Sequence, residues 1–138
     1  MSVNSFARTV DLLHRGMDAE TIRREVIANN LANAGVPNFK RSEVNFESEL
    51  KKALDSAKKR PALEMARSDP RHLTNVVETD YRDVRPRINL DYLTTAQADG
   101  SNVDAEQEVQ LLVQNQMKYN LLAQAVAFEF NEVASVMR

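Results

Sequence analysis

The chain contains no cysteine and no tryptophan, and its 138 residues include only two histidines and three glycines. Without cysteine, disulfide bonds and thiolate metal sites are excluded. His14 and His72 are far apart in the sequence, with no metal-ligand spacing around either, so we expect no metal site. The glycines match neither a phosphate-binding loop nor a nucleophile elbow. We therefore expect no catalytic residue, no cofactor and no small-molecule substrate, and we predict that the protein is not an enzyme.

Long apolar runs are also missing. The first fifteen residues hold no apolar core of a cleaved secretory signal, and no stretch approaches the length of a transmembrane segment. The net charge of −2 argues against a nucleic-acid partner. The charge is uneven, because residues 39–61 carry seven Lys or Arg against four Asp or Glu, whereas residues 99–138 carry two against six. Most of these charges fit solvated faces, although the basic middle and acidic end also suit attraction between neighbouring copies.

What the sequence does contain is a long helical pattern in its last third, residues 104–138. Apolar residues recur there at alternating spacings of four and three, which is typical of a coiled coil, and only Gln116 interrupts the series. Asp104 is a suitable N-cap, and neither Gly nor Pro follows it. We assign the following residues to an intramolecular seam: Val109, Leu112, Tyr119, Val126, Phe130, Val133 and Met137.

The same helix has a second apolar side. Met117, Leu121 and Phe128 lie outside the seam, and the last two point nearly opposite to it. A helix that is apolar on several sides must be buried on several sides. This pattern fits either the central helix of a small bundle or a helix that packs in an assembly. We assign Met117, Leu121 and Phe128 to an assembly face that contacts neighbouring subunits.

A second long helix is predicted over residues 3–33, where apolar residues keep a similar but weaker spacing. Its end is marked by Gly35 and Pro37. We expect Gly35 to take a left-handed conformation after the helix, so that a β-branched residue there would be costly. The pair Pro37 and Asn38 suits the centre of a turn.

The middle of the chain has a different character. Helical spacing predicts a short basic helix over residues 41–59. Alternating apolar residues predict short strands at 63–65 and 88–92, separated by polar and proline-containing loops. Because this region is poor in apolar residues, we expect an extended arm rather than an independent domain.

The segment after the first predicted helix carries a specific resemblance. Residues 27–40 read IANNLANAGVPNFK, which resembles the N-terminal signature of the bacterial flagellar axial proteins, the family of rod, hook and hook–filament junction subunits. The family form is approximately I-A-N-N-[IL]-A-N-x-x-T-P-G-Y-K, and here Val36, Asn38 and Phe39 replace the Thr, Gly and Tyr. The signature residues are Asn29, Asn30, Leu31, Ala32, Asn33, Gly35, Pro37, Phe39 and Lys40.

Within that family the chain is similar to the rod subunits at the base of the flagellum. It is short, with no room for a large outer domain, and residues 40–50 and 99–104 are similar to the corresponding segments of those subunits. Further along, Glu106, Glu108 and the pairs 115–116 and 119–120 continue the resemblance.

The resemblance implies a mainly α fold. The long N- and C-terminal helices would pair as an antiparallel coiled coil, and an extended middle arm would contain a short helix and short β-strands. We divide the chain into an N-terminal coiled-coil helix at 1–35, an extended middle region at 36–100 and a C-terminal coiled-coil helix at 101–138, forming one domain overall. Many copies would then pack their helix pairs into a helical tube.

The resemblance also implies a function and partners. The chain would be a structural subunit of the flagellar basal-body proximal rod in the periplasmic space, transmitting motor torque and exported without a cleaved signal peptide. Its partners would be other copies of itself, other flagellar rod proteins, the rod/MS-ring adaptor FliE and the flagellar type III export apparatus. The alternatives are a sister rod protein of the same family, a stand-alone cytoplasmic coiled-coil adaptor or chaperone, and a small enzyme.

Overall fold

A computed structural model describes residues 3–58, 69, 71, 79–94 and 100–137. The chain forms two compact units. The first unit combines Met1–Val44 with Ile88–Arg138, and the second is Asn45–Arg87. Each unit is described by itself below.

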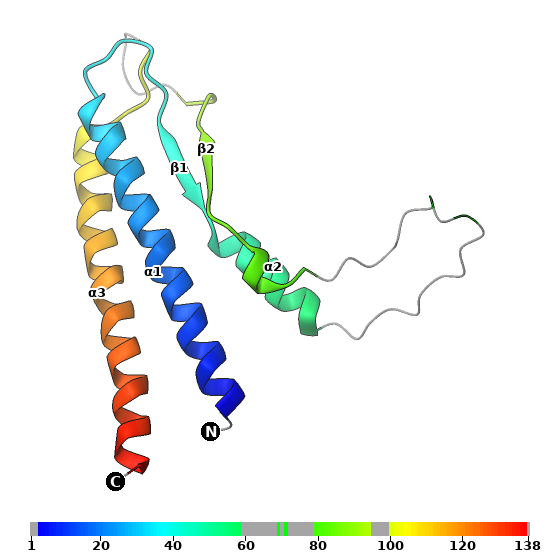
Figure 1. The fold of residues 1–138 in the computed structure, drawn as a ribbon. Coiled ribbons are helices and arrows are strands. Elements are labelled where there is room, and N and C mark those ends of the chain that lie inside the picture. Colours follow the sequence, from blue (N-terminus) through cyan, green and yellow to red (C-terminus); the bar gives the residue numbers. More distant parts are fainter. Residues whose placement is uncertain (1–2, 59–68, 70, 72–78, 95–99, 138) are drawn as a thin grey trace. The chain divides into compact units, whose positions relative to one another are not determined.

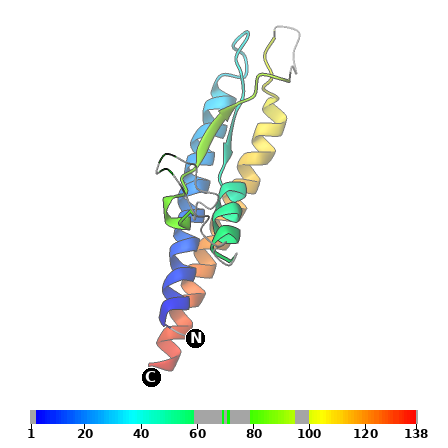
Figure 2. The same cartoon turned by 90° about the vertical axis from the view of Figure 1, so that its right-hand side faces the viewer.

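The first unit is organised around two long helices, α1 (Val3–Ala32) and α3 (Ala105–Val136). They pack side by side and run in opposite directions, as both Figure 1 and the turned view in Figure 2 show. The predicted pairing of the N- and C-terminal helices in a mainly α fold is therefore confirmed. Among the described residues, no helix is both long and apolar enough to span a bilayer.

The start of α3 follows the sequence pattern closely. Asp104 has an extended conformation, and its side chain accepts hydrogen bonds from the N–H groups of Glu106 and Gln107. These bonds satisfy two of the donors that a helix start leaves free, which confirms Asp104 as the N-cap. Gly16, in the middle of α1, does not interrupt that helix. Leu122 of α3 approaches closely at this position, where a small residue leaves room for it.

The chain leaves α1 through two successive turns. The N–H of Val36 donates to the carbonyl of Asn33 at 3.0 Å, and the N–H of Phe39 donates to the carbonyl of Val36 at 3.2 Å. The second bond closes a turn with Pro37 and Asn38 at its centre, where Asn38 has φ of 61°. This is the predicted Pro-Asn turn, and Asn tolerates the positive φ that a glycine holds elsewhere.

The expectation for Gly35 is wrong. Among the described residues, positive φ occurs only at Asn38 and Gly100, so Gly35 is not left-handed. The physical reason is the route of the chain, because α1 ends at Ala32 and a turn hydrogen bond continues from there. The turn that follows places the positive φ at Asn38, which is three residues after Gly35.

The helix predicted over residues 41–59 begins later than expected. Ser42–Asn45 forms the strand β1, and the helix α2 spans Glu47–Lys58. β1 pairs with β2 (Arg87–Leu90) in a two-stranded sheet, and the two strands run in opposite directions in Figure 1. The strand predicted at 88–92 is thus confirmed with slightly different ends, whereas the one predicted at 63–65 lies outside the described residues.

The second unit has a small core of its own. Phe46, Ala53 and Val84 are its buried apolar residues, and the short 3₁₀ helix η1 (Tyr81–Asp83) packs on α2. In the first unit the buried apolar residues are also few: Ala19, Val26, Ile27 and Val103. Polar residues complete that core, and they define the site described next.

Candidate functional site

Asn30 connects the end of α1 to β1. Its side chain is fully buried, and it makes a reciprocal pair of bonds with the backbone of Ser42. The Asn30 Oδ1 accepts from the Ser42 N–H at 3.0 Å, and the Asn30 Nδ2 donates to the Ser42 carbonyl at 2.9 Å. The same Nδ2 lies 3.4 Å from the carboxylate of Glu108 on α3. One signature asparagine therefore joins α1, β1 and α3.

Glu108 forms an ion pair with Arg41. Its side chain is fully buried, and the guanidinium of Arg41 donates a hydrogen bond to it and another to Glu43. Burial would lower the pKa of Arg41, but the bonds to Glu108 and Glu43 outweigh it and the pKa is raised. A buried carboxylate that keeps its charge needs such a partner, because an unpaired one costs several kcal/mol.

The segment before α3 completes this cluster. The N–H of Arg41 donates to Asn102 Oδ1 at 2.6 Å, and Asn102 Nδ2 donates to the carbonyl of Asp91 at 2.8 Å. We call Asn30, Arg41, Ser42, Asn102 and Glu108 the signature cluster. It joins the segments that begin and end the middle region to both long helices.

The signature turn also contacts the loop before α3. Lys40 Nζ donates to the carbonyl of Gly100 at 2.9 Å. Gly100 has φ of 84°, and a Cβ added there would lie only 2.6 Å from Asn38 Oδ1. Gly100 is therefore favoured by its left-handed backbone, and a Cβ there would also make the side chain of Asn38 move.

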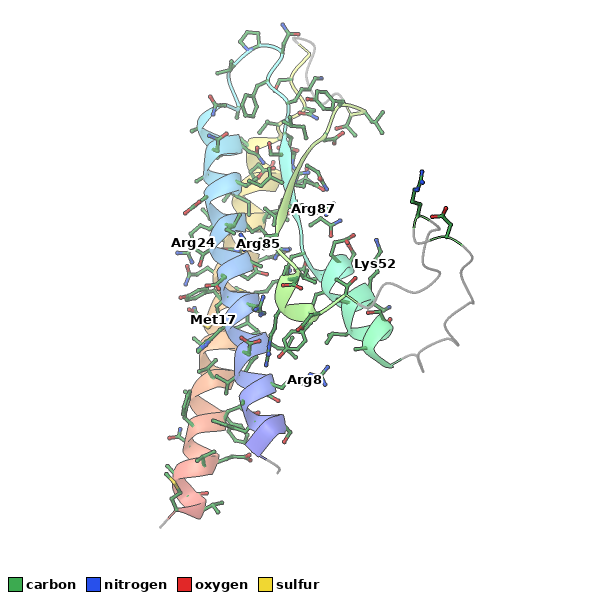
Figure 3. The ribbon with its side chains drawn as sticks, turned by 45° about the vertical axis from the view of Figure 1, so that its right-hand side comes forward. Arg8, Met17, Arg24, Lys52, Arg85 and Arg87 are labelled. Atoms are coloured by element: carbon green, nitrogen blue, oxygen red, sulfur yellow. The ribbon has the colours of Figure 1, made fainter. Side chains whose placement is uncertain are left out.

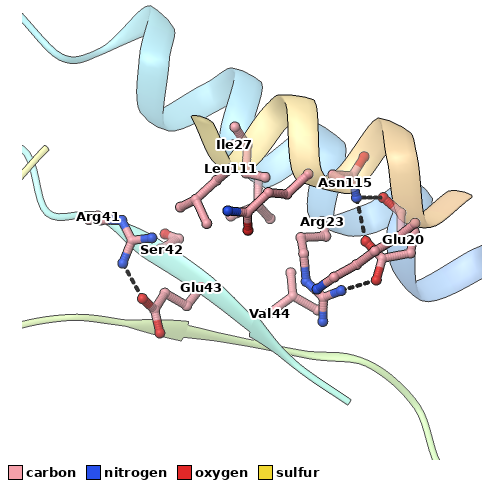
Figure 4. A pocket seen from close by; sticks show the side chains of 12 residues that line it. Glu20, Arg23, Ile27, Arg41, Ser42, Glu43, Val44, Leu111 and Asn115 are labelled. Carbon is pink, nitrogen blue, oxygen red and sulfur yellow. Dashed lines mark hydrogen bonds and ion pairs between the residues drawn. The ribbon is translucent and has the colours of Figure 1, made fainter. Parts of the chain in front are cut away.

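A second polar cluster crosses the helix pair near its middle. Asn115 Nδ2 donates to the carbonyl of Glu20 at 2.8 Å and to its carboxylate at 2.6 Å, and both residues are buried. Arg23 pairs with the same carboxylate along α1. Figure 4 shows these contacts. Arg24, labelled in Figure 3, donates a hydrogen bond to Gln116, and its guanidinium carbon lies 5.7 Å from the centroid of the Tyr119 ring. We call Glu20, Arg23 and Asn115 the midhelix cluster.

A cavity of about 200 Å³ lies between the two clusters, bounded by α1, β1 and α3. Val26, Ile27, Val44 and Leu111 give it an apolar wall, and charged groups of both clusters form its rim. Among the described residues, no group of His, Asp or Glu has the arrangement of a metal site.

The residues assigned to the seam occupy different environments. Leu112, Tyr119, Val126 and Val133 are half-buried, whereas Val109 and Met137 are exposed. Phe130 is also half in solvent, but its ring meets that of Phe6 edge-on, with centroids 5.6 Å apart.

The three residues assigned to the assembly face lie on the surface of α3. Met117, Leu121 and Phe128 are 60%, 64% and 62% exposed, so the helix pair leaves them uncovered. In the signature, Asn30 is buried, while Leu31, Asn33, Phe39 and Lys40 are half-buried. The remaining signature residues, Asn29, Ala32, Gly35 and Pro37, are exposed.

Sequence reasoning missed the polar interior. Helical spacing assigns no buried polar contact to Glu108, Asn115 or Glu20, because carboxylates and amides are seldom buried. A usable signal was present, since Glu108 and Asn115 are one heptad apart and immediately precede Val109 and Gln116 of the apolar series. The partner residues could not be found in the same way, because Arg41 and Asn30 belong to distant segments.

The second unit contains a separate groove of about 600 Å³. Its lining includes the cations Lys52, Arg85 and Arg87, which Figure 3 labels. Lys52 pairs with Glu49 at 2.8 Å, and this hydrogen bond lowers the pKa of Glu49. Of the basic residues counted in residues 39–61, Lys52 lines this groove, whereas Arg85 and Arg87 come from a later segment.

Comparisons with known proteins agree on one group. Residues 13–40 match the family model described as "Flagella basal body rod protein". The flagellar basal body rod protein FlgB of Borreliella burgdorferi is 41% identical over 136 residues, covering 99% of this chain and 100% of that protein. FlgB of Borrelia hermsii is also 41% identical over the same coverage, and FlgB of Bacillus subtilis is 32% identical over 96% of this chain and 95% of its own length.

Proposed function

Because this chain belongs to the FlgB family of flagellar basal body rod proteins, we propose that it is a structural rod subunit that self-assembles through the assembly face of α3. The assembly would be a helical tube that transmits motor torque. A structural role follows from the family. The face used for assembly, the tube and the torque are the parts that experiments must test.

The observation that carries the proposal is the exposed assembly face. Met117, Leu121 and Phe128 lie at intervals of four and seven residues and are each more than half in solvent. Large exposed apolar side chains that gather along one side of a helix mark an interaction surface. A monomer in water gains nothing from exposing them, whereas a neighbouring helix would remove them from solvent.

The geometry of the contact decides the type of assembly. The assembly face belongs to α3 alone, so a neighbouring copy can meet it with a different surface of its own. Contacts between unlike surfaces produce open helical filaments or tubes when the rotation between neighbouring copies does not close a ring. A stand-alone adaptor would instead bury the same face in a closed oligomer of fixed size. Size-exclusion chromatography over a range of concentrations distinguishes the two.

The remaining partners and the location follow from the same proposal. The subunit would leave the cytoplasm through the flagellar type III export apparatus and take its place in the periplasmic space. There it would contact other rod proteins and the rod/MS-ring adaptor FliE. The relatives' names support the location in the basal body rod, and the long unpartnered face of α3 supports contact with other helical subunits.

The test is the substitution Phe128→Asp in a cell that depends on this chain for motility. A charge at a contact that becomes buried costs several kcal/mol unless it is paired. We expect export to continue, no rod to form and motility to be lost. Since Phe128 is 62% exposed, circular dichroism of the purified chain should change little.

The matched control is Ala134→Asp, which adds the same charge to an exposed position of α3 about a third of a turn around the helix from the assembly face. This variant should remain motile. A normal rod built from Phe128→Asp subunits would show that the outer face of α3 is not the assembly surface.

A further inference from the structure

Two long helices with repeating apolar residues can pair in more than one register. On α3 the half-buried residues Leu112, Tyr119, Val126 and Val133 are each seven positions apart. A shift of one heptad between the helices therefore exchanges one apolar side chain for another. The apolar seam alone discriminates poorly between the correct alignment and its neighbours.

The polar contacts do not repeat in this way. In the observed alignment Glu20 faces Asn115, and Asn30 faces Glu108. A heptad shift in one direction brings Glu108 to the position of Asn115, where two buried carboxylates, Glu20 and Glu108, would meet. A shift in the other direction brings Leu122 opposite Glu20 and leaves that carboxylate without its amide partner.

We propose that Glu20, Glu108 and Asn115 are register-determining residues, which select one alignment of α3 on α1. In the correct register their burial is compensated by hydrogen bonds and by Arg41, so they contribute little net stability. In a shifted register the same groups are buried without partners. Removing one partner of a buried ionic pair is strongly unfavourable, which corresponds to a preference of roughly a hundredfold or more for the correct alignment.

Register selection would matter most where several copies bring many similar helices together. Each subunit of a tube must present its assembly face at the same height, and a heptad error would move that face by about 10 Å along the helix. Polar residues in an apolar seam are a known way to fix alignment in coiled coils at some expense of stability. Register is a property of one subunit, so it can be tested separately from rod assembly.

The absence of cysteine makes register directly measurable with introduced pairs. A Cβ at Gly16 would lie 3.4 Å from Leu122 Cδ1, so Gly16→Cys with Leu122→Cys reports the observed register. Gly16→Cys with Glu129→Cys reports a heptad shift in one direction. Thr9→Cys with Leu122→Cys reports a shift in the other. Each pair is treated with a short thiol cross-linker in the purified full-length chain, in TMAO to favour the compact state.

In the otherwise unchanged chain, we expect only the pair at 16 and 122 to cross-link efficiently. The test background is the triple substitution Glu20→Leu, Glu108→Leu and Asn115→Leu, made together with Arg41→Met so that the buried ion pair of Arg41 and Glu108 is replaced as a whole. Replacing a whole buried pair by apolar residues of similar volume is often neutral or stabilising, so helicity should be retained. The two shifted pairs should then cross-link at yields comparable to the first.

The matched control is Leu112→Ala, which weakens the apolar seam and leaves the polar contacts intact. It should lower helicity without producing shifted cross-links. Two results would overturn the inference. One is a fourfold variant that keeps its helicity and cross-links only at 16 and 122. The other is a fourfold variant that loses its helicity and cross-links nowhere, because the polar residues would then support folding rather than register.

Discussion

The two ends of the helix pair are built on different principles. At the signature end, where α1 finishes and α3 begins, the most deeply buried side chains are Asn30, Ser101, Val103 and Glu108, and three of these four are polar. At the terminal end, where α1 begins and α3 finishes, several large apolar side chains are exposed. Phe130 is 51% exposed there and Val136 is 85% exposed. Polar side chains are thus buried at the signature end, whereas apolar side chains are exposed to solvent at the terminal end.

This contrast separates the residues that define the internal arrangement of the subunit from the residues that can contact neighbouring helices. Hydrogen bonds between buried groups have strict geometry, so the signature end can define one arrangement of α1, β1 and α3. Apolar contacts have little directionality and scale with area, so the terminal end can adapt to whichever helices surround it. A subunit that must first take one internal arrangement and then pack with neighbours has use for both.

Among the substitutions that test this contrast, Glu108→Ala is expected to lower the free energy of unfolding most. The substitution leaves Arg41 and Asn30 without their buried partner, and losing one member of a buried pair costs about 3 kcal/mol or more. Urea denaturation in TMAO, followed by circular dichroism, measures this loss. The control Glu106→Ala removes an exposed carboxylate from the same helix turn and should cost well under half as much. Equal losses would mean that the buried pair is energetically unimportant.

A smaller loss is expected from Gly100→Val, also at the signature end. A left-handed backbone costs a non-glycine residue about 1–2 kcal/mol, and the new Cβ would collide with the side chain of Asn38. The free energy of unfolding should fall by about 2 kcal/mol or more. Asn38→Gly removes the collision but not the backbone strain at residue 100, so Gly100→Val should cost less in an Asn38→Gly chain than in the otherwise unchanged chain. Equal losses in both chains would assign the whole effect to the backbone of residue 100.

The terminal end should respond more weakly in the isolated chain. Phe130→Ala removes a half-exposed ring and its edge-on contact with Phe6, an interaction worth about 1 kcal/mol. A double-mutant cycle with Phe6→Ala measures the coupling between the two rings. A coupling above that between Arg41 and Glu108, measured by alanine substitution in the same way, would reverse the contrast between the two ends.

Much of the architecture follows from periodicity. The two long helices, their N-cap at Asp104 and the turn at Pro37 and Asn38 are determined by residues close in sequence, so local rules predict them well. The strand β1 is different. The sequence predicts a helix over residues 41–59, but the backbone of Ser42 is held by the side chain of Asn30, which no local pattern reveals.

The site shows the same limit more sharply. Exposed apolar residues such as Leu121 and Phe128 could be placed on an outer face from helical geometry alone. The burial of Glu108 could not, because it depends on Arg41 arriving from another segment to compensate the charge. Sequence patterns rank residues by their average tendency, and a buried carboxylate is an exception that only its partner explains.

The smallest effect is expected from Gly35→Val, the substitution that the sequence pattern ranks as damaging. Gly35 belongs to the signature but is exposed, is not left-handed and would place a Cβ with no atom within 4 Å. Neither strain nor collision opposes valine there, so the free energy of unfolding should change by less than about 0.5 kcal/mol, the usual range for surface sites. Parallel urea curves for Gly35→Val and Gly100→Val provide the comparison, and motility should survive only the first. If Gly35→Val is instead the more damaging of the two, its role is contact with a neighbouring subunit, because the single chain provides no reason for the loss.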